Sequence, residues 1–266
     1  MTSLPCHGRI SCRRCWEGTE AEAEIIKDTL SFRMPQAFQV INNPGAWGSQ
    51  NPKIMVLGQT KGFTQSDAMA DAVDEEDYEK VAFADSREEL HAILRSLGLA
   101  TEVNDLDPLF SKDQQDWHWG SIIRCTLAAW DKKIRKKTNE PVGWSSASTL
   151  VGKAYNSTLL GKFPRNCTDQ FLSELPDRLR LVVVLGNAPD HVKRVRNMIA
   201  RVHKDLTLHP EAPEVAYTAG GATWVHIVHP SGSARGYHAD FIAGDAATSQ
   251  GSKARQARRA ISAAGL

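Results

Sequence analysis

The sequence predicts a three-layer α/β/α sandwich, in which a central, mostly parallel four-stranded sheet forms one domain of 266 residues. Two observations support this fold. Short apolar runs recur along the chain, each ending in a glycine or a polar turn, and helical patterns alternate with them. Strands that alternate with helices form parallel sheets, and such sheets bind ligands at the carboxyl ends of their strands. The four expected strands are residues 53–57, 121–127, 181–185 and 224–229.

The ends of these runs indicate where a site would lie. The run 53–57 stops at Gly58, which opens a turn that lets a ligand approach the backbone closely. The run 181–185 is apolar throughout, as in the middle of a parallel sheet. The last run stops at His229, because Pro230 has no backbone N–H to continue a ladder. This imidazole at the sheet edge would either donate to a ligand oxyanion or simply cap the strand.

Helical spacing is expected in several segments between the strands. Ser86 to Leu97 has apolar residues at helical intervals, and Ser86 with Glu89 matches a capping box. Residues 1–50 are interpreted as a cysteine-bearing arm wrapped on the core, and residues 131–162 as an irregular insertion. The other expected helices are residues 20–30, 171–179, 191–203 and 252–264.

Composition and charge limit the classes of protein to which the chain could belong. With 41% hydrophobic residues the chain has enough apolar side chains for a core, and it shows neither a signal-peptide pattern nor an apolar run of membrane-spanning length. We therefore expect a cytoplasmic monomer without membrane contact. The net charge is only +1, but basic residues gather in three runs that would bind phosphates or form solvated faces. These are Arg9, Arg13 and Arg14; the basic residues of 132–137; and Lys253, Arg255, Arg258 and Arg259.

The cysteines indicate a metal or iron–sulfur site. Cys12 and Cys15 are spaced so that both thiolates of one turn reach a single metal, and no apolar strand precedes them as in a redox dithiol. Cys125 and Cys167 are the expected distant ligands, with Cys6 in reserve. The alternative is a set of scattered structural thiols.

Taken in order, these segments resemble the uracil-DNA glycosylase superfamily, most closely its iron–sulfur families 4 and 5. The stretch 53–62 is similar to the family's first motif, and the segment 82–86 to the one whose phenylalanine, here Phe83, stacks on the extruded base. The stretch 121–125 lies where the family has Asn-Val-Val-Lys-Cys. Cys167, the run 182–186 and the His229-Pro-Ser turn complete the series, and together these motifs span most of the chain.

The resemblance implies roles for individual residues. His229 would donate to the departing base and Gln59 would orient a water. The substrate would contact Gly58, Thr60, Phe83, Ser121 and Ser231, and Arg235 would fill the gap that the flipped nucleotide leaves. Cys12, Cys15, Cys125 and Cys167 would hold a structural 4Fe–4S cluster. The partner would be DNA that contains uracil or other deaminated bases, with activity at the nucleoid.

This sequence departs from the family pattern at important places. Gln59 and Thr60 stand where relatives have carboxylates, Lys61 replaces a proline, and Ser121 replaces the uracil-reading asparagine. The sequence does not place the carboxylates of Asp67, Asp71 and Asp85. Three alternatives therefore stay open: an enzyme directed mainly at hypoxanthine or xanthine, a nucleic-acid-binding relative with weak or no catalysis, and a metal-bound redox or regulatory protein.

Overall fold

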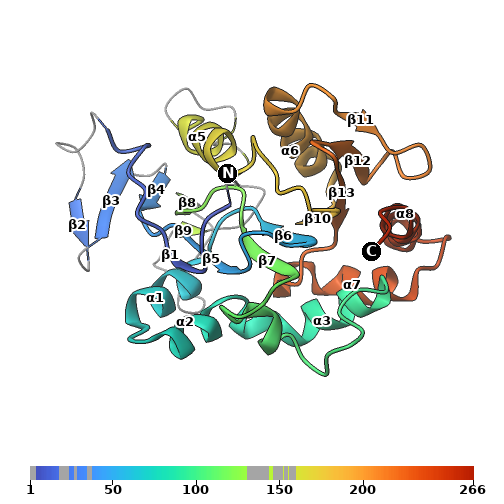
Figure 1. Ribbon diagram of the computed structural model, residues 1–266, viewed down its shortest axis with the longest axis horizontal. Helices are drawn as coiled ribbons and strands as arrows, with labels where there is room; N and C mark the ends of the chain where they lie inside the picture. Colours follow the sequence, from blue (N-terminus) through green and yellow to red (C-terminus); the bar gives the residue numbers. More distant parts are fainter. Residues whose placement is uncertain are drawn as a thin grey trace.

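A computed structural model of the chain describes residues 4–17, 24–26, 29–34, 38–130, 144–145, 152, 155 and 160–266. It shows a mixed α/β fold in which helices flank a central sheet (Figure 1). The sheet order is β1-β5-β7-β6-β10-β13-β12-β11. The strands are β1 (Gly8–Arg9), β5 (Gly45–Gly48), β6 (Ile54–Gly58), β7 (Trp117–Ser121), β10 (Leu181–Leu185), β11 (Thr207–Leu208), β12 (Ala216–Ala219) and β13 (Ala222–Ile227).

The four central strands are parallel, as expected, but the sheet has eight strands and not four. β7, β6, β10 and β13 pair in parallel, and antiparallel strands extend both edges. The expectation missed the edge strands because they are short. β1 and β11 contain two residues each, too few to form a recognisable apolar pattern.

Both faces of the central sheet are buried, which explains the uninterrupted apolar runs. Val56 and Val183 face one core, with α3 (Arg87–Ser96), α7 (Arg235–Ala243) and α8 (Ser249–Ala263). Leu57 and Val184 face the other, with α5 (Lys162–Phe171) and α6 (Pro189–Val202). Figure 1 shows α5 and α6 on one side of the sheet and α3 and α7 on the other.

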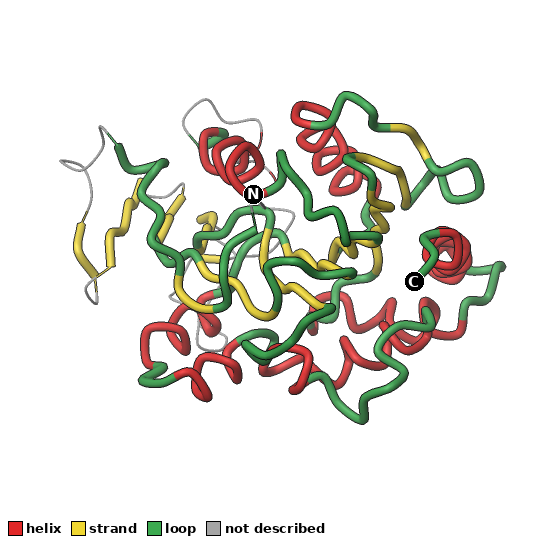
Figure 2. The backbone as a smooth tube through the Cα atoms, in the orientation of Figure 1, coloured by secondary structure: helices red, strands yellow, loops and turns green. Residues whose placement is uncertain are grey.

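A second, antiparallel sheet was not expected. Its order is β2-β3-β4-β8-β9, and Figure 2 shows it extending to one side of the molecule. The predicted helix 20–30 is wrong, because β2 and β3 occupy this stretch as a hairpin that pairs with β4. The strands are β2 (Glu24–Ile26), β3 (Thr29–Met34), β4 (Phe38–Ile41), β8 (Thr126–Trp130) and β9 (Trp144–Ser145).

The predicted strand 121–127 is instead the junction between the two sheets. β7 ends at Ser121 and β8 begins at Thr126, so that Cys125 lies in the connection between them. A parallel bridge from Lys61 to Thr126 links the loop after β6 to the second sheet. A partly apolar stretch can therefore contain a turn, which periodicity alone does not reveal.

Three of the predicted helices are confirmed, whereas one predicted helix cap and one further predicted helix are wrong. α3, α6 and α8 lie where expected, within a few residues. The capping box is wrong, since Ser86 makes no side-chain cap hydrogen bond. The predicted helix 171–179 is also wrong, because α5 ends at Phe171 where that helix would begin. Pro164 lies in the first turn of α5, where a missing N–H costs nothing. The insertion 131–162 lies mostly outside the described residues.

Gly251 in the first turn of α8 offers a test of the fold. Its backbone N–H bonds to the Thr248 hydroxyl, and a Cβ at this position would lie 1.9 Å from the Asp245 carbonyl oxygen. Because backbone must move to relieve this overlap, Gly251→Ala should destabilise the protein by about 1–3 kcal/mol in urea unfolding. Gly236→Ala is the matched control, since a Cβ on this α7 residue meets nothing within 4 Å. Equal urea midpoints for the two variants would contradict the close packing at Gly251.

Candidate active-site pocket and cysteine centre

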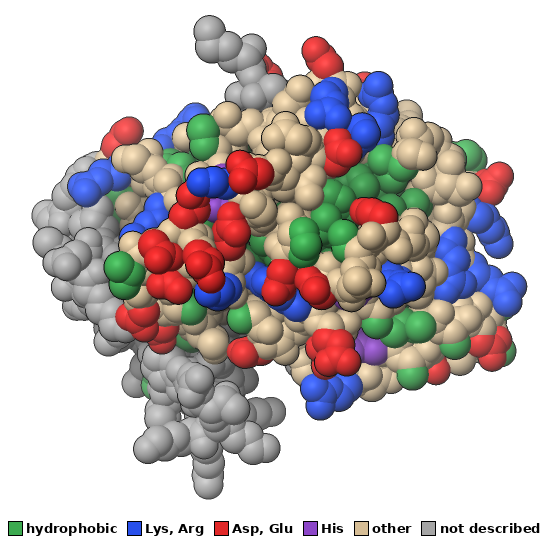
Figure 3. Space-filling view, turned by 60° about the horizontal axis from the view of Figure 1, so that its bottom comes forward, with side chains coloured by type: hydrophobic (Ala, Val, Ile, Leu, Met, Phe, Trp, Pro, Cys, Tyr) green, Lys and Arg blue, Asp and Glu red, His purple; other side chains and the backbone are tan. Residues whose placement is uncertain are grey.

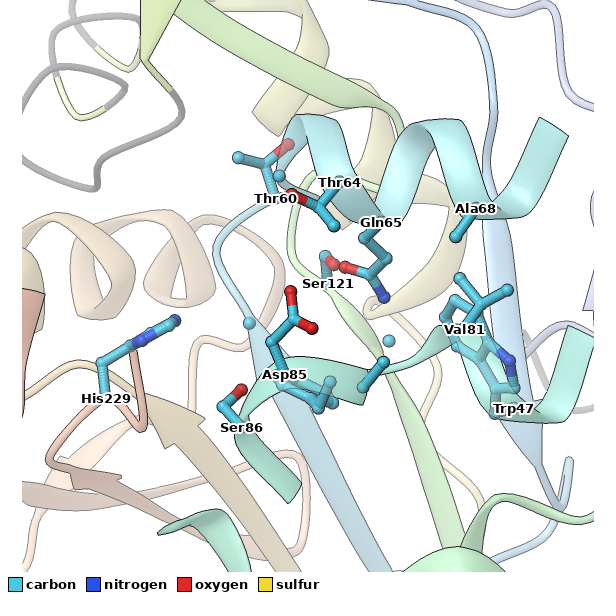
Figure 4. A pocket seen from close by; sticks show the side chains of 15 residues that line it. Trp47, Thr60, Thr64, Gln65, Ala68, Val81, Asp85, Ser86, Ser121 and His229 are labelled. Atoms are coloured by element: carbon cyan, nitrogen blue, oxygen red, sulfur yellow. The ribbon is translucent and has the colours of Figure 1, made fainter. Parts of the chain in front are cut away.

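A cavity of about 190 Å³ opens at the carboxyl ends of β6 and β7 (Figure 4). We call it the pocket. Its walls come from segments far apart in the sequence, including α1 (Phe63–Asp71), α2 (Glu75–Val81) and the short helix η2 (Ala84–Ser86). The lining residues are Trp47, Gly58, Thr60, Gly62, Thr64, Gln65, Ala68, Val81, Phe83, Ala84, Asp85, Ser86, Gly120, Ser121 and His229.

The pocket brings together most of the substrate-contacting residues that the sequence analysis named. Gly58 ends β6 and Thr60 follows it, Ser121 ends β7, and His229 follows β13. The carboxyl ends of parallel strands therefore meet here, as the open α/β topology requires. Phe83 completes the set from the loop after α2. Gln59, Ser231 and Arg235 do not line the pocket.

The turn after β6 places Gln59 away from the pocket lining. Its side chain is buried outside the pocket lining, and neither amide atom has a hydrogen-bond partner among the described residues. Thr60 lines the pocket, but its hydroxyl donates to the Cys125 carbonyl (2.7 Å) and accepts from the Leu127 N–H (3.0 Å). The turn after β6 thus supplies shape and backbone, but no free group for acid–base chemistry.

His229 presents a defined ring nitrogen to the pocket. The Ser231 backbone N–H donates to His229 Nδ1 at 3.0 Å, so Nδ1 carries no proton. In the neutral ring the proton is then on Nε2, and Figure 4 shows the ring directed toward the pocket. Burial, with a smaller contribution from His238, lowers the pKa of His229 to about 4. The imidazole is therefore a neutral N–H donor at neutral pH.

Phe83 has an unusual backbone conformation. Its φ is +55° and its ψ is +23°, a left-handed geometry that is strained for a bulky residue. The ring packs against Phe110 and Trp119, with centroids at 6.2 and 6.1 Å. Packing thus holds the strained turn in place, as commonly found at functional sites.

Ser231 and Arg235 contribute from outside the pocket. Ser231 fixes the His229 ring through its backbone N–H. Arg235 begins α7, where its side chain is 74% exposed and lies 3.5 Å from Glu89 of α3. Such an exposed ion pair is weak, so Arg235 is available to a large ligand at the surface.

Four polar pocket residues were not predicted as site residues: Thr64 and Gln65 from α1, and Asp85 and Ser86 from η2. Figure 4 shows the Gln65 amide and the Asp85 carboxylate directed into the cavity. The sequence signal for α1 was weak, because its apolar residues are few and it follows Gly62 without a side-chain cap. Only the sheet edge and the turn at Phe83 bring these side chains together.

The four predicted ligand cysteines gather around α5; we call them the cysteine centre. Asn166 donates to Cys15 Sγ (3.3 Å), and Cys12 Sγ lies 3.4 Å from Gln170 Oε1, so the α5 amides on either side of Cys167 hold the N-terminal turn. Cys6 is exposed and takes no part in these contacts. Within the described residues, however, no three His, Cys, Asp or Glu side chains converge as a metal-binding group.

Burial and neighbouring thiols raise the pKa of two cysteines of the cysteine centre, Cys125 and Cys167. Burial raises the pKa of Cys125 well above its usual value, and the neighbouring Cys167 raises it further. Burial likewise raises the pKa of Cys167 to about 12, although a backbone hydrogen bond from Arg124 acts to lower it. Without a metal these thiols stay protonated at neutral pH.

Two buried cations adjoin the cysteine centre. The side chains of Lys61 and Arg124 are each only 1% exposed, and no carboxylate pairs with either among the described residues. The Lys61 ammonium donates to the Arg124 carbonyl, and the Arg124 guanidinium faces His118 Nε2 at 3.4 Å. Burial lowers the pKa of Lys61 to about 8, while Cys125 opposes this shift. A buried, uncompensated positive charge is costly, so the region favours an anionic occupant.

Much of the predicted basic surface has an internal role. Arg9 binds carbonyls at the end of α1, Arg255 binds the Gly244 carbonyl, and Arg258 binds those of Ser96 and Ile242. These residues therefore cap helix ends and are less free to bind phosphates than expected. Acidic side chains gather on one side of the face that Figure 3 shows, and α2 carries Glu75, Glu76 and Asp77.

Comparisons with known proteins do not assign the chain to a family. No protein-family model matches the sequence, and no curated protein matches it either. Within the described residues, none of the helices has both the length and the apolarity to cross a membrane.

Proposed function

We propose that this protein is a monofunctional DNA glycosylase that extrudes uracil or another deaminated base and hydrolyses its N-glycosidic bond. The observation that carries the proposal is the convergence of Gly58, Phe83, Ser121 and His229 in one pocket at the edge of the parallel strands. These residues come from four separate segments, and each belongs to a motif that resembles the glycosylase superfamily. The uracil-DNA glycosylase-like form of the α/β/α fold is part of the same proposal.

The pocket offers two of the interactions that base release needs. Phe83 presents an aromatic ring, and stacking of a base on such a ring contributes about 1–3 kcal/mol toward the cost of extrusion. The His229 Nε2–H would bond to the oxygen of the base on which negative charge develops as the glycosidic bond breaks. The small Ser121 reads fewer polar atoms than an asparagine would, so deaminated purines are also candidate substrates.

The test is release of base from duplexes that each contain one uracil, hypoxanthine or xanthine. We expect abasic product from at least one duplex and none from an undamaged control. Release from the purine duplexes alone would shift the assignment to a hypoxanthine or xanthine enzyme. Tight binding without abasic product from any duplex would contradict glycosylase activity and indicate a nucleic-acid-binding relative.

We further propose that the cysteine centre holds a structural iron–sulfur cluster. Four thiolates around an iron–sulfur core carry net negative charge, which Lys61 and Arg124 would balance. Such a cluster would tie the N-terminal turn to α5 and to the connection between β7 and β8. The thiols would have to close around it, because they do not converge as a metal-binding group among the described residues.

Removing one buried cation should therefore weaken cluster retention. For Lys61→Met we expect about half or less of the iron and acid-labile sulfide of the parent, because the anionic centre loses a partner in a low-dielectric region. Iron and sulfide analysis with visible absorption measures this effect. Lys80→Met is the control, since Lys80 is exposed on α2 and pairs only with Glu76 among the described residues. Unchanged iron and sulfide in Lys61→Met would contradict the role of the buried charge.

A further inference from the structure

The backbone carbonyl of His229 is held by a side chain from another element. The ladder of β13 with β10 ends at Ile227, and Pro230 has no backbone N–H, so the chain leaves the sheet at this point. The His238 Nε2–H donates to the His229 carbonyl oxygen at 2.9 Å. Because a carbonyl oxygen can only accept a hydrogen bond, the proton of the His238 ring is on Nε2. A buried imidazole thus supplies the partner that the sheet no longer provides.

His238 is a firmly placed donor. It lies in α7, and only 7% of its surface is exposed. Phe241, one helical turn further along, belongs to the core between the sheet and α3, α7 and α8. The donor therefore lies on a packed helix, whereas the acceptor belongs to the loop that leads from β13 into η5 (Gly232–Ala234). The bond fixes one carbonyl of that loop to the body of the protein.

This bond reaches the His229 ring through the geometry of the backbone. A peptide group is planar, so a fixed His229 carbonyl fixes the plane that joins His229 to Pro230. The proline ring restricts φ at the next residue, which directs the following N–H, that of Ser231, toward His229 Nδ1 (3.0 Å). The Ser231 carbonyl in turn accepts from the Ala234 N–H at 2.9 Å. The carbonyl bond and the ring bond are therefore two parts of one turn.

We infer that His238 is a positioning residue, which holds the turn 229–231 so that the His229 ring keeps its Nε2–H directed into the pocket. The effect on catalysis rests on the proposed glycosylase function. His238 does not line the pocket, so it acts only through His229. Without the bond the His229 carbonyl would turn toward another donor, and the Ser231 N–H would no longer face Nδ1. The neutral ring would then exchange between two tautomers, of which only one donates to the substrate.

His238→Phe tests this role, because phenylalanine keeps a ring of similar size but cannot donate. We expect single-turnover base release from the duplex that the parent cleaves to fall by about 10–100-fold, since a small displacement of a reacting group costs rate on this scale. Affinity for a duplex with an uncleavable 2′-fluoro nucleotide should stay within about threefold, because the loss lies in the chemical step. His238→Gln has an N–H that can reach the same carbonyl, and it should recover most of the rate.

His91→Phe is the matched control. His91 lies in α3, and its Nε2 likewise bonds to a backbone carbonyl nine residues away, that of Ala100, at 3.2 Å. Its loss therefore removes an equivalent hydrogen bond between a helix and a loop. Because His91 does not line the pocket, His91→Phe should cleave at the parent rate.

Two further measurements separate positioning from stability. In a His229→Ala protein, adding His238→Phe should change the rate by less than about twofold, because the ring that His238 positions is already gone. Nitrogen NMR of histidine-labelled protein reads the ring directly. The parent should show one protonated and one unprotonated nitrogen for His229, and in His238→Phe both signals should move toward the average of the two tautomers. His238→Leu, a second variant without the donor, should behave as His238→Phe does.

Parent-like rates in His238→Phe and His238→Leu, or an equal loss in His91→Phe, would overturn the inference. So would a His229 ring that stays in one tautomer without the donor. A parent that releases no base from uracil, hypoxanthine or xanthine duplexes would overturn the proposed function, and the NMR result would still decide whether His238 holds the turn.

Discussion

Replacing His229 by alanine should reduce single-turnover base release by about 10²–10³-fold, which is the usual loss when one oxyanion donor is removed. The fixed tautomer is the reason, because the Ser231 N–H occupies Nδ1 and leaves Nε2–H for the substrate. Affinity for an uncleavable duplex should change little, since the interaction strengthens only as negative charge develops on the base. Quenched-flow measurement of abasic product gives the rate, and gel shift gives the affinity.

Two variants separate this role from a structural one. His229→Gln keeps a side-chain N–H donor and should recover part of the lost rate. His203→Gln is the control, because His203 lies away from the pocket and bonds to the Leu172 carbonyl (2.7 Å), which a glutamine amide can also do. If His229→Ala cleaved at the parent rate while His203→Gln behaved normally, His229 would have no part in the reaction.

The pH dependence of the His229 contribution follows from its lowered pKa. With a folded-state pKa of about 4, the neutral donor is fully present above about pH 5 and is lost as pH falls through 4. Between pH 6 and 8 we therefore expect no inflection in the rate that depends on His229. The pH–rate profiles of the parent and of His229→Gln should have the same shape in this range. An inflection near pH 6.5 that disappears in this variant would show a solvated, ordinary histidine.

The second large effect is loss of the folded state in mild acid. Burial lowers the pKa of His118 and His191 to about 3 and that of His226 to about 4. These folded-state values lie below that of an exposed histidine, so the stability they contribute is complete above pH 6.5. It is lost as pH falls, because the unfolded chain takes up protons first. At pH 4 each of these histidines lowers the free energy of unfolding by about 3 kcal/mol. The three losses together approach the whole stability of a typical domain.

Urea unfolding followed by circular dichroism between pH 8 and pH 4.5 measures this loss. We expect a plateau above about pH 7 and a steep fall below pH 6, with a slope that approaches three protons from these residues. His191→Phe provides the comparison, because neither nitrogen of His191 has a hydrogen-bond partner among the described residues. It should lower the slope by about one proton without loss of stability at pH 8. A slope equal to that of the parent would contradict the burial of a neutral His191.

The sequence predicted the parts of this fold that depend on local pattern. The apolar runs at β6, β10 and β13 identified three of the four parallel strands, since a strand buried on both faces leaves an unbroken run of apolar residues. Pro230 indicated the end of the last strand to within two residues, since β13 ends at Ile227 and His229 follows it. The helices α3, α6 and α8 followed from their spacing. The hairpin β2–β3 did not, because the charged residues around it resemble a surface helix.

The candidate site was only partly predictable for a related reason. Short motifs marked Phe83, Ser121 and His229, which line the pocket, whereas Gln59 in the turn after β6 lies outside the lining. The pocket carboxylate comes from Asp85, whose direction depends on the left-handed turn at Phe83 and its packing on Phe110 and Trp119. No local pattern encodes that conformation in a phenylalanine.

The sequence by itself thus determined three of the four parallel, buried strands, where one imidazole would emerge and which thiols could share a site. Tertiary structure alone decided that the sheet extends to eight strands, that Lys61 and Arg124 lie buried without carboxylate partners in the described part of the chain, and that Asp85 faces the pocket. The physical reason is the separation along the chain over which each effect acts. Hydrophobic periodicity and proline act within a few residues, whereas edge pairing, charge compensation and pocket lining depend on segments that meet only when the chain packs.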